Sequence, residues 1–195
     1  AESDTDKALA ALLALSRAGD KSVQSDLIAA LRRMEFSSLT TKQKIAWLRT
    51  AGLAFIRMGE PDTETRSAIA SALDPSFPSA NTDVNAMLID MMVYLQAPSA
   101  AEKGVAMLNA APNQEAQIHI AKALRLLRTG WTPELQADYF GWFNRAAAFR
   151  GGASFGRFID SIKTDALDGL TEDQKVALKP VFEAEVKQKT PLEAM

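Results

Sequence analysis

The sequence contains no cysteine and a single histidine, His119. Without cysteine there can be no disulfide scaffold, thiolate metal site, iron–sulfur cluster or cysteine nucleophile, and no Cys-x-x-Cys-His attachment of a c-type haem. One histidine excludes His-rich metal sites and motifs that need two histidines. We therefore predict no catalytic residue, no cofactor and no metal ion for this chain.

The sequence also has little net charge and no long apolar run. The 22 Lys and Arg residues nearly balance the 24 Asp and Glu residues, which argues against binding to nucleic acid or to an anionic membrane. The most apolar stretch, 86–97, is interrupted by Asp90 and is too short to cross a bilayer. The polar start of the chain shows no signal peptide. We expect no membrane insertion by this segment.

Helix-forming residues are abundant, with 34 Ala and 21 Leu among 195 residues. Apolar positions recur at helical spacing, and no segment alternates with the period of a strand for long enough. Three capping boxes mark predicted helix starts, namely Thr40 with Gln43, Ser99 with Glu102, and Thr171 with Gln174. Pro180 should kink or split the last helix, because proline lacks the N–H and crowds the preceding turn.

The predicted helices number about ten, and every second one begins about 32 to 41 residues after the last, a period typical of HEAT and armadillo-like repeats. One helical hairpin cannot bury its apolar face alone, so stacked hairpins share a core. The pattern predicts an all-α fold, a right-handed α–α superhelix of five antiparallel hairpins forming one domain over 1–195. A closed helical bundle is the alternative.

Motifs for chemistry are weak. The run 151–157 (GGASFGR) resembles a phosphate loop but lacks the Gly-Lys-Ser/Thr ending and the preceding strand, so a flexible turn with Ser154 as the cap of the next helix is the better interpretation. His119, alone within a helix, is more typical of a hydrogen-bonded structural residue than of a ligand. An enzyme or small-ligand binder with a site near His119, Trp131 and Arg150 is the alternative function.

Aromatic residues are concentrated, because eight of the 14 lie between Trp131 and Phe158. In the predicted helix 132–149, helical spacing places most of the aromatic residues on one face of the helix. Phe140 lies outside that face. A bulky core is one interpretation, and the other is a partner surface, because aromatics and arginine are favoured interface anchors. The candidate interaction surface comprises His119, Trp131, Phe140, Arg145, Phe149 and Arg150.

The runs GWTPEL at 130–135, YF at 139–140, WF at 142–143, RGG at 150–152 and SF at 154–155 resemble a known family. Shorter pieces agree, such as GLAFIR at 52–57 followed by GEP, and QIH at 117–119. They are similar to a HEAT-like helical-repeat region of large secreted proteins of planctomycetes and related bacteria. Those proteins are labelled membrane-bound dehydrogenases or haem-binding proteins, and the similarity spans nearly the whole chain.

The resemblance implies a position between an N-terminal β-propeller resembling sugar dehydrogenases and a C-terminal cytochrome c domain. It implies a segment excised from a larger extracytoplasmic or periplasmic protein, and it maps no catalytic residue onto this chain. We therefore expect a non-catalytic scaffold or protein-interaction module that spaces or docks these neighbouring domains. A cytoplasmic helical adaptor is a third hypothesis.

Overall fold

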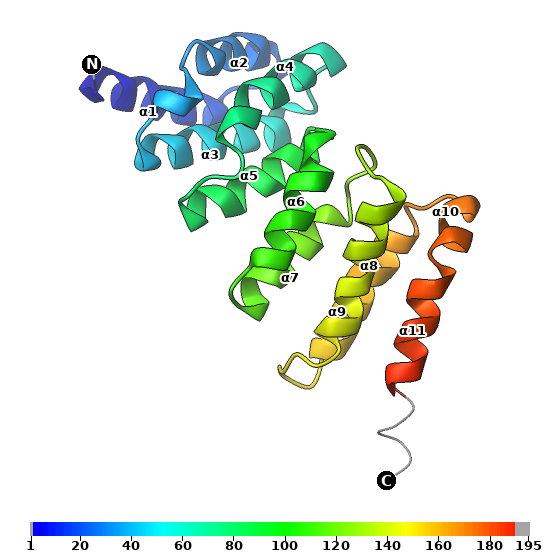
Figure 1. The fold of residues 1–195 in the computed structure, drawn as a ribbon. Coiled ribbons are helices and arrows are strands. Elements are labelled where there is room, and N and C mark those ends of the chain that lie inside the picture. Colours follow the sequence, from blue (N-terminus) through cyan, green and yellow to red (C-terminus); the bar gives the residue numbers. More distant parts are fainter. Residues whose placement is uncertain (1, 190–195) are drawn as a thin grey trace. The chain divides into compact units, whose positions relative to one another are not determined.

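The structure is a computed structural model that describes residues 2–189. These residues form helices and no strand, which confirms the all-α prediction (Figure 1). The α-helices are α1 (Glu2–Ala18), α2 (Gln24–Arg32), α3 (Thr41–Met58), α4 (Thr63–Leu73), α5 (Thr82–Tyr94), α6 (Ser99–Ala110), α7 (Gln114–Leu124), α8 (Pro133–Ala146), α9 (Phe155–Leu167), α10 (Glu172–Ala177) and α11 (Lys179–Lys189). Short 3₁₀ helices are η1 (Lys21–Val23), η2 (Phe36–Ser38) and η3 (Asp74–Ser76).

The chain divides into two compact units, Ala1–Ala97 and Pro98–Met195. The first unit contains α1 to α5 and the second contains α6 to α11. Each unit has its own buried side chains. We describe each unit separately.

In the first unit, α3 is the central helix, because it contacts α1, α2 and α5 (Figure 1). Trp47 of α3 is 3% exposed and donates its Nε1–H to the Leu31 carbonyl oxygen at 3.0 Å. Phe36 of η2 meets the Trp47 ring edge-on, with centroids 5.4 Å apart. The buried indole thus finds a partner for its polar atom, as a buried tryptophan usually does.

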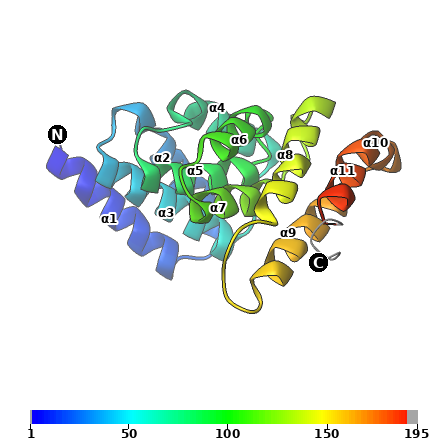
Figure 2. The same ribbon diagram turned by 60° about the horizontal axis from the view of Figure 1, so that its bottom comes forward.

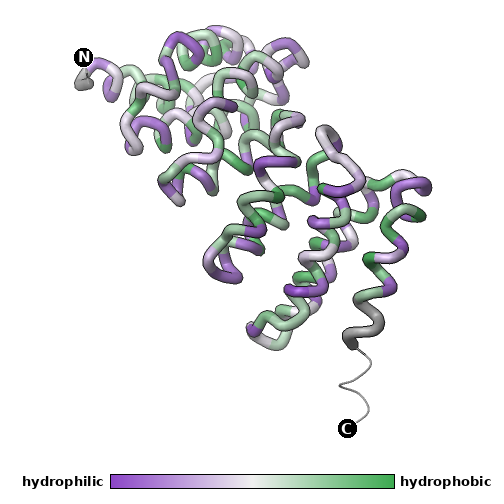
Figure 3. Tube along the Cα trace, in the orientation of Figure 1, coloured by the Kyte–Doolittle hydropathy of each residue, from purple (hydrophilic) through white to green (hydrophobic). Residues whose placement is uncertain are grey.

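In the second unit, α8 is the central helix, because α6, α9 and α11 all contact it. Further contacts join α6 to α7, α7 to α9 and α10 to α11. Figure 2 shows these helices from a second side. Hydrophobic and hydrophilic residues interchange along these helices, as amphipathic helices require (Figure 3).

Helix ends agree with the sequence signals at most points. The capping boxes of Thr40 and Thr171 both form. The predicted box at Ser99 is wrong, because α6 already begins at Ser99 and the preceding Pro98 offers no side-chain cap. Ser154 likewise makes no side-chain cap for α9.

The last predicted helix is split, as the proline indicated. α10 ends at Ala177 and α11 begins at Lys179, with Pro180 in its first turn. Proline is tolerated there, because the N–H groups of a first turn have no partner within the helix. None of the described helices is long and apolar enough to span a bilayer.

Candidate functional site

The aromatic run of 131–158 has a buried part in the middle of α8. Its members are 3% exposed or less, and they are Tyr139, Phe140, Trp142 and Phe143. Phe140 meets the ring of Phe182 of α11 edge-on, with centroids 5.7 Å apart. The surface role predicted for Phe140 is therefore wrong, because α11 covers the side of α8 that helical spacing left outside the core.

Two hydrogen bonds satisfy the polar atoms of this buried part. The Tyr139 hydroxyl donates to the Ala121 carbonyl oxygen of α7 at 2.9 Å, and the Trp142 Nε1–H donates to the Gln117 Oε1 at 2.9 Å. Burial raises the pKa of the Tyr139 phenol far above its usual value. Tyr139 and Trp142 thus tie α8 to α7 and act as structural residues.

An open groove lies where α8 ends and α9 begins. Its volume is about 530 Å³, and both apolar and charged side chains line it. The lining residues are Phe143, Ala146, Ala147, Phe149, Arg150, Gly151, Gly152, Phe155, Gly156, Ile159, Asp160 and Lys163. We name it the α8–α9 groove. Five of these residues are glycine or alanine, and their small size leaves the space open.

The α8–α9 groove includes two of the predicted surface residues. Phe149 is half-buried, and its ring meets the Trp142 ring edge-on with centroids 5.9 Å apart. The Phe149 ring therefore contacts the core and also lines the groove. Arg150 is exposed, and its guanidinium makes no hydrogen bond or ion pair with the described residues. The same holds for the exposed Arg157 one turn into α9. Phe158, 43% exposed, adds apolar surface beside it.

The loop that forms one side of the groove is held in place by Gln114 of α7. Its Nε2 donates to the Arg150 carbonyl oxygen at 2.9 Å, and its Oε1 accepts the Arg150 backbone N–H at 3.3 Å. Arg145, one of the predicted surface residues, is exposed and donates to the Asn109 Oδ1 at 2.8 Å. These contacts fix the backbone of the groove and leave the Arg150 side chain available to a partner.

A smaller cavity lies at the other end of α8, between the turn before α8 and the turn before α10. Its volume is about 180 Å³. Its lining combines apolar, aromatic and polar side chains: Leu124, Arg125, Leu127, Arg128, Trp131, Gln136, Tyr139, Phe140, Ala166, Gly169, Leu170, Thr171 and Gln174. We name it the Gln136 cavity.

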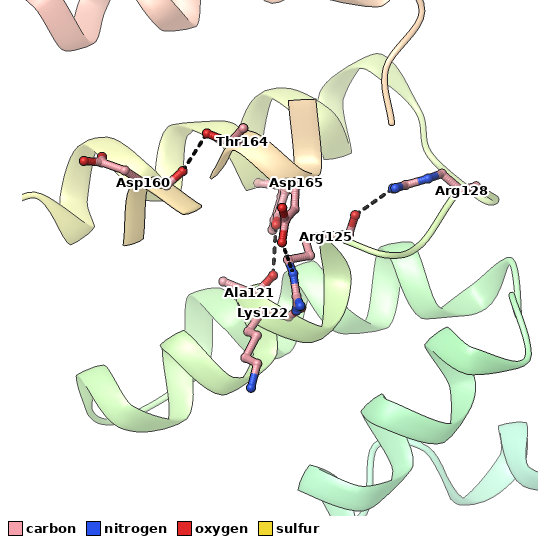
Figure 4. Close-up of polar contacts among 8 residues, drawn as sticks. Ala121, Lys122, Arg125, Arg128, Asp160, Thr164 and Asp165 are labelled. Atoms are coloured by element: carbon pink, nitrogen blue, oxygen red, sulfur yellow. Dashed lines mark hydrogen bonds and ion pairs between the residues drawn. The ribbon is translucent and has the colours of Figure 1, made fainter. Parts of the chain in front are cut away.

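Much of the polar lining of the Gln136 cavity is engaged within the unit. The Arg125 Nε–H donates to the Asp165 Oδ2 of α9 at 2.9 Å, and Arg128 donates to the Arg125 carbonyl oxygen at 2.6 Å (Figure 4). The Trp131 Nε1–H donates to the Leu127 carbonyl oxygen at 3.0 Å. These bonds hold α7, α9 and the intervening turns around the cavity.

His119, Trp131 and Arg150 do not converge on one cavity. Trp131 lines the Gln136 cavity, whereas Arg150 lines the α8–α9 groove. They lie beyond opposite ends of α8, whose 14 residues span roughly 21 Å. His119 is a half-buried residue of α7 and lines neither space. The geometry gives the alternative site near these three residues no support.

Sequence reasoning missed three glutamines that organise these places. Gln114 holds the groove loop, Gln117 accepts from Trp142, and Gln136 faces the cavity. A glutamine at an otherwise apolar helical position was the available signal for Gln136. The partners of Gln114 and Gln117 lie 36 and 25 residues away, so their roles depend on the fold.

No group of three or more His, Asp or Glu side chains could hold a metal ion in the part of the chain that the structure describes. Comparisons with protein-family models, with curated proteins and with solved structures find no match to this chain. The α8–α9 groove and the Gln136 cavity are therefore the features of the molecule from which a function can be inferred.

Proposed function

We propose that this chain is a non-catalytic helical interaction module whose α8–α9 groove docks an acidic, apolar segment of a protein partner. The observation that carries the proposal is an open groove lined by the aromatic Phe149 and Phe155 together with the exposed guanidinium of Arg150. Aromatic residues and arginine are the residue types that contribute most to interface free energy.

The charge around the α8–α9 groove selects the partner's chemistry. Among the lining residues, Arg150 and Lys163 carry positive charge and Asp160 carries negative charge, in a chain whose net charge is −2. This local surplus favours Asp and Glu side chains in the partner and disfavours Lys and Arg. The apolar lining residues Phe149, Phe155 and Ile159 favour an aliphatic or aromatic side chain between those acids.

A protein partner fits this groove better than a small metabolite. The space of about 530 Å³ is open along one side and extends over two helices and their loop. Such a shape can accommodate several side chains of an extended segment, as grooves that bind peptides do.

Helix packing supports a repeat architecture within each unit. Helices two apart in the chain contact each other, as α1 does with α3, α3 with α5, α6 with α8 and α7 with α9. Successive hairpins of HEAT-like arrays stack in this manner. With the resemblance described above, this packing supports a HEAT-like or armadillo-like module. In its parent protein it would space or dock a dehydrogenase-like propeller and a cytochrome c domain outside the cytoplasm.

Fluorescence anisotropy with labelled peptides tests the docking proposal. The first probe is DELDEFDLED, the second replaces every acid by lysine, and the third replaces every leucine and phenylalanine by serine. We expect saturable binding of the first alone, weakened by added salt because exposed charges are screened. Absence of saturable binding of the first peptide, or equal binding of all three, would contradict the proposal.

A glycine substitution supplies the matched variant. A Cβ atom at Gly156, in the first turn of α9, meets no atom within 4 Å, so Gly156→Leu fills the groove without a backbone clash. Gly52→Leu in α3 is the control, because its Cβ position is equally open and lies in the other unit. We expect peptide binding to fall at least about tenfold in Gly156→Leu only, a loss of about 1.4 kcal/mol.

The gene sequence on either side of this segment tests the parent context. We expect a propeller-coding region upstream and a Cys-x-x-Cys-His motif downstream. If both are found, titration of the whole chain with the adjoining cytochrome c domain distinguishes docking from spacing. Loss of that binding in Gly156→Leu would place the contact at the groove. A gene with neither neighbour would remove the scaffold role in a redox protein and leave the peptide-binding proposal to its own test.

A further inference from the structure

Gln136 is a buried polar residue without a partner in the described structure. It lies in the first turns of α8, is 5% exposed and lines the Gln136 cavity. Its side-chain amide makes no hydrogen bond to the described residues, yet none of its polar atoms is sealed from solvent. The amide therefore opens into the cavity. Because solvent reaches the amide, water can satisfy it when the cavity holds no ligand.

The other walls of the Gln136 cavity define what could occupy it. Leu124, Leu127 and Leu170 are apolar, and the Trp131 and Tyr139 rings lie 5.4 Å apart at an interplanar angle of 46°. The volume of about 180 Å³ exceeds that of cavities of about 150 Å³ that admit benzene. One six-membered ring with a polar substituent fits these walls.

The charge at the Gln136 cavity is positive. Arg125 and Arg128 both line it, no acidic side chain among the described residues does, and α8 meets it along its side at Gln136, Tyr139 and Phe140. The ion pair with Asp165 balances Arg125, and Asp165 does not line the cavity. An anionic group is favoured by the guanidinium groups of arginine.

We infer that the Gln136 cavity is a binding site for a monocyclic aromatic or heteroaromatic carboxylate. The ring lies against Trp131 and the leucines, and its polar edge pairs with the Gln136 amide. The carboxylate lies on the side of Arg125 and Arg128. This site is at the opposite end of α8 from the α8–α9 groove and does not depend on the docking proposal.

Nuclear magnetic resonance of the ¹⁵N-labelled full chain tests this inference directly. The probes are nicotinate, its neutral analogue nicotinamide, and the cationic benzylamine, each titrated to about 10 mM. We expect saturable shifts of the Gln136 side-chain amide resonances with nicotinate, weaker binding of nicotinamide and none of benzylamine. No saturable shift with nicotinate would overturn the inference and leave the amide hydrated only.

The variant Gln136→Met removes the amide and keeps the side-chain length. We expect at least about tenfold weaker nicotinate binding, the factor that one hydrogen bond contributes. We also expect unchanged stability, because the Gln136 amide makes no hydrogen bond to the described residues that the substitution could break. Gln24→Met is the matched control: Gln24 is 8% exposed, and its Nε2 donates to the Gly59 carbonyl oxygen at 2.5 Å. It should lose stability and keep nicotinate binding. Unchanged binding in Gln136→Met would overturn the inference.

Discussion

The aromatic run of α8 and the segment after it divides into two parts with different environments. In the middle of α8, Tyr139 and Trp142 are covered by other helices and bonded to α7. After α8, Phe149 is half-buried and Phe158 is 43% exposed, in a segment with glycines at 151, 152 and 156. The same residue types thus form a core where neighbouring helices cover them and a partly exposed surface where the chain around them is rich in small residues.

Substitution of a buried aromatic residue in the middle of α8 should have the largest effect on the free energy of unfolding. Trp142→Ala removes a fully buried indole and leaves a cavity, so we expect the free energy of unfolding to fall by about 3 to 5 kcal/mol. Phe158→Ala, in the exposed part, should change it by less than about 0.5 kcal/mol. Urea denaturation of both variants checks this. Equal losses in the two would remove the distinction between the two parts.

The next largest effect on stability should come from Gln117, which accepts the hydrogen bond of the buried Trp142 indole. Gln117→Met leaves the Trp142 N–H without its acceptor, and we expect a loss of about 1 to 3 kcal/mol in the free energy of unfolding. Gln114→Met, which breaks the contacts to the exposed Arg150 backbone, should cost less, because water can replace them. Thermal unfolding of the pair measures the difference, and a larger cost for Gln114→Met would contradict it.

Tyr139 should make the free energy of unfolding depend on pH. Its raised pKa means that the folded chain keeps the phenol proton at pH values where the unfolded chain loses it. This stabilising contribution is complete below about pH 10 and should decline as the pH rises further. Tyr139→Phe should cost about 1 kcal/mol at neutral pH and show a shallower decline above pH 10. Identical slopes in the two proteins, measured by urea denaturation, would contradict the assignment.

The smallest effect should come from the ion pair near the Gln136 cavity. The side chains of Arg125 and Asp165 are 19% and 46% exposed, so solvent screens their attraction. We expect Asp165→Asn to lower the free energy of unfolding by about 0 to 1 kcal/mol, less at high salt. A loss above that of Gln117→Met would show that this pair, rather than the buried part of α8, holds the unit together.

Much of the fold could be predicted from the sequence because its signals are local. The capping residues Thr40 and Thr171, the glycine at 59 and the proline at 180 all mark helix ends through the backbone of the next few residues. Ser99 was misleading, because a serine can equally occupy the first helical position.

The candidate sites were harder to predict, because they depend on which helices meet. Phe140 was assigned to the surface by spacing on α8 alone, and only the packing of α11 shows it to be core. Phe149 and Arg150 were identified from residue type, and the structure places both in the α8–α9 groove. Gln136 stood out in the sequence as a glutamine at an otherwise apolar helical position, but the cavity itself could not be predicted because turns more than 30 residues apart form it.

The pairing of Gln114 with Arg150 has a consequence for engineering. It fixes the chain on the α8 side of the turn, while Gly152 and Ala153 beyond it are exposed, and a Cβ atom at Gly152 would meet open space. The backbone between these two residues is therefore a suitable point for new termini or for an inserted reporter domain. A fluorophore placed there would lie beside the α8–α9 groove and could report occupancy without a label on the partner.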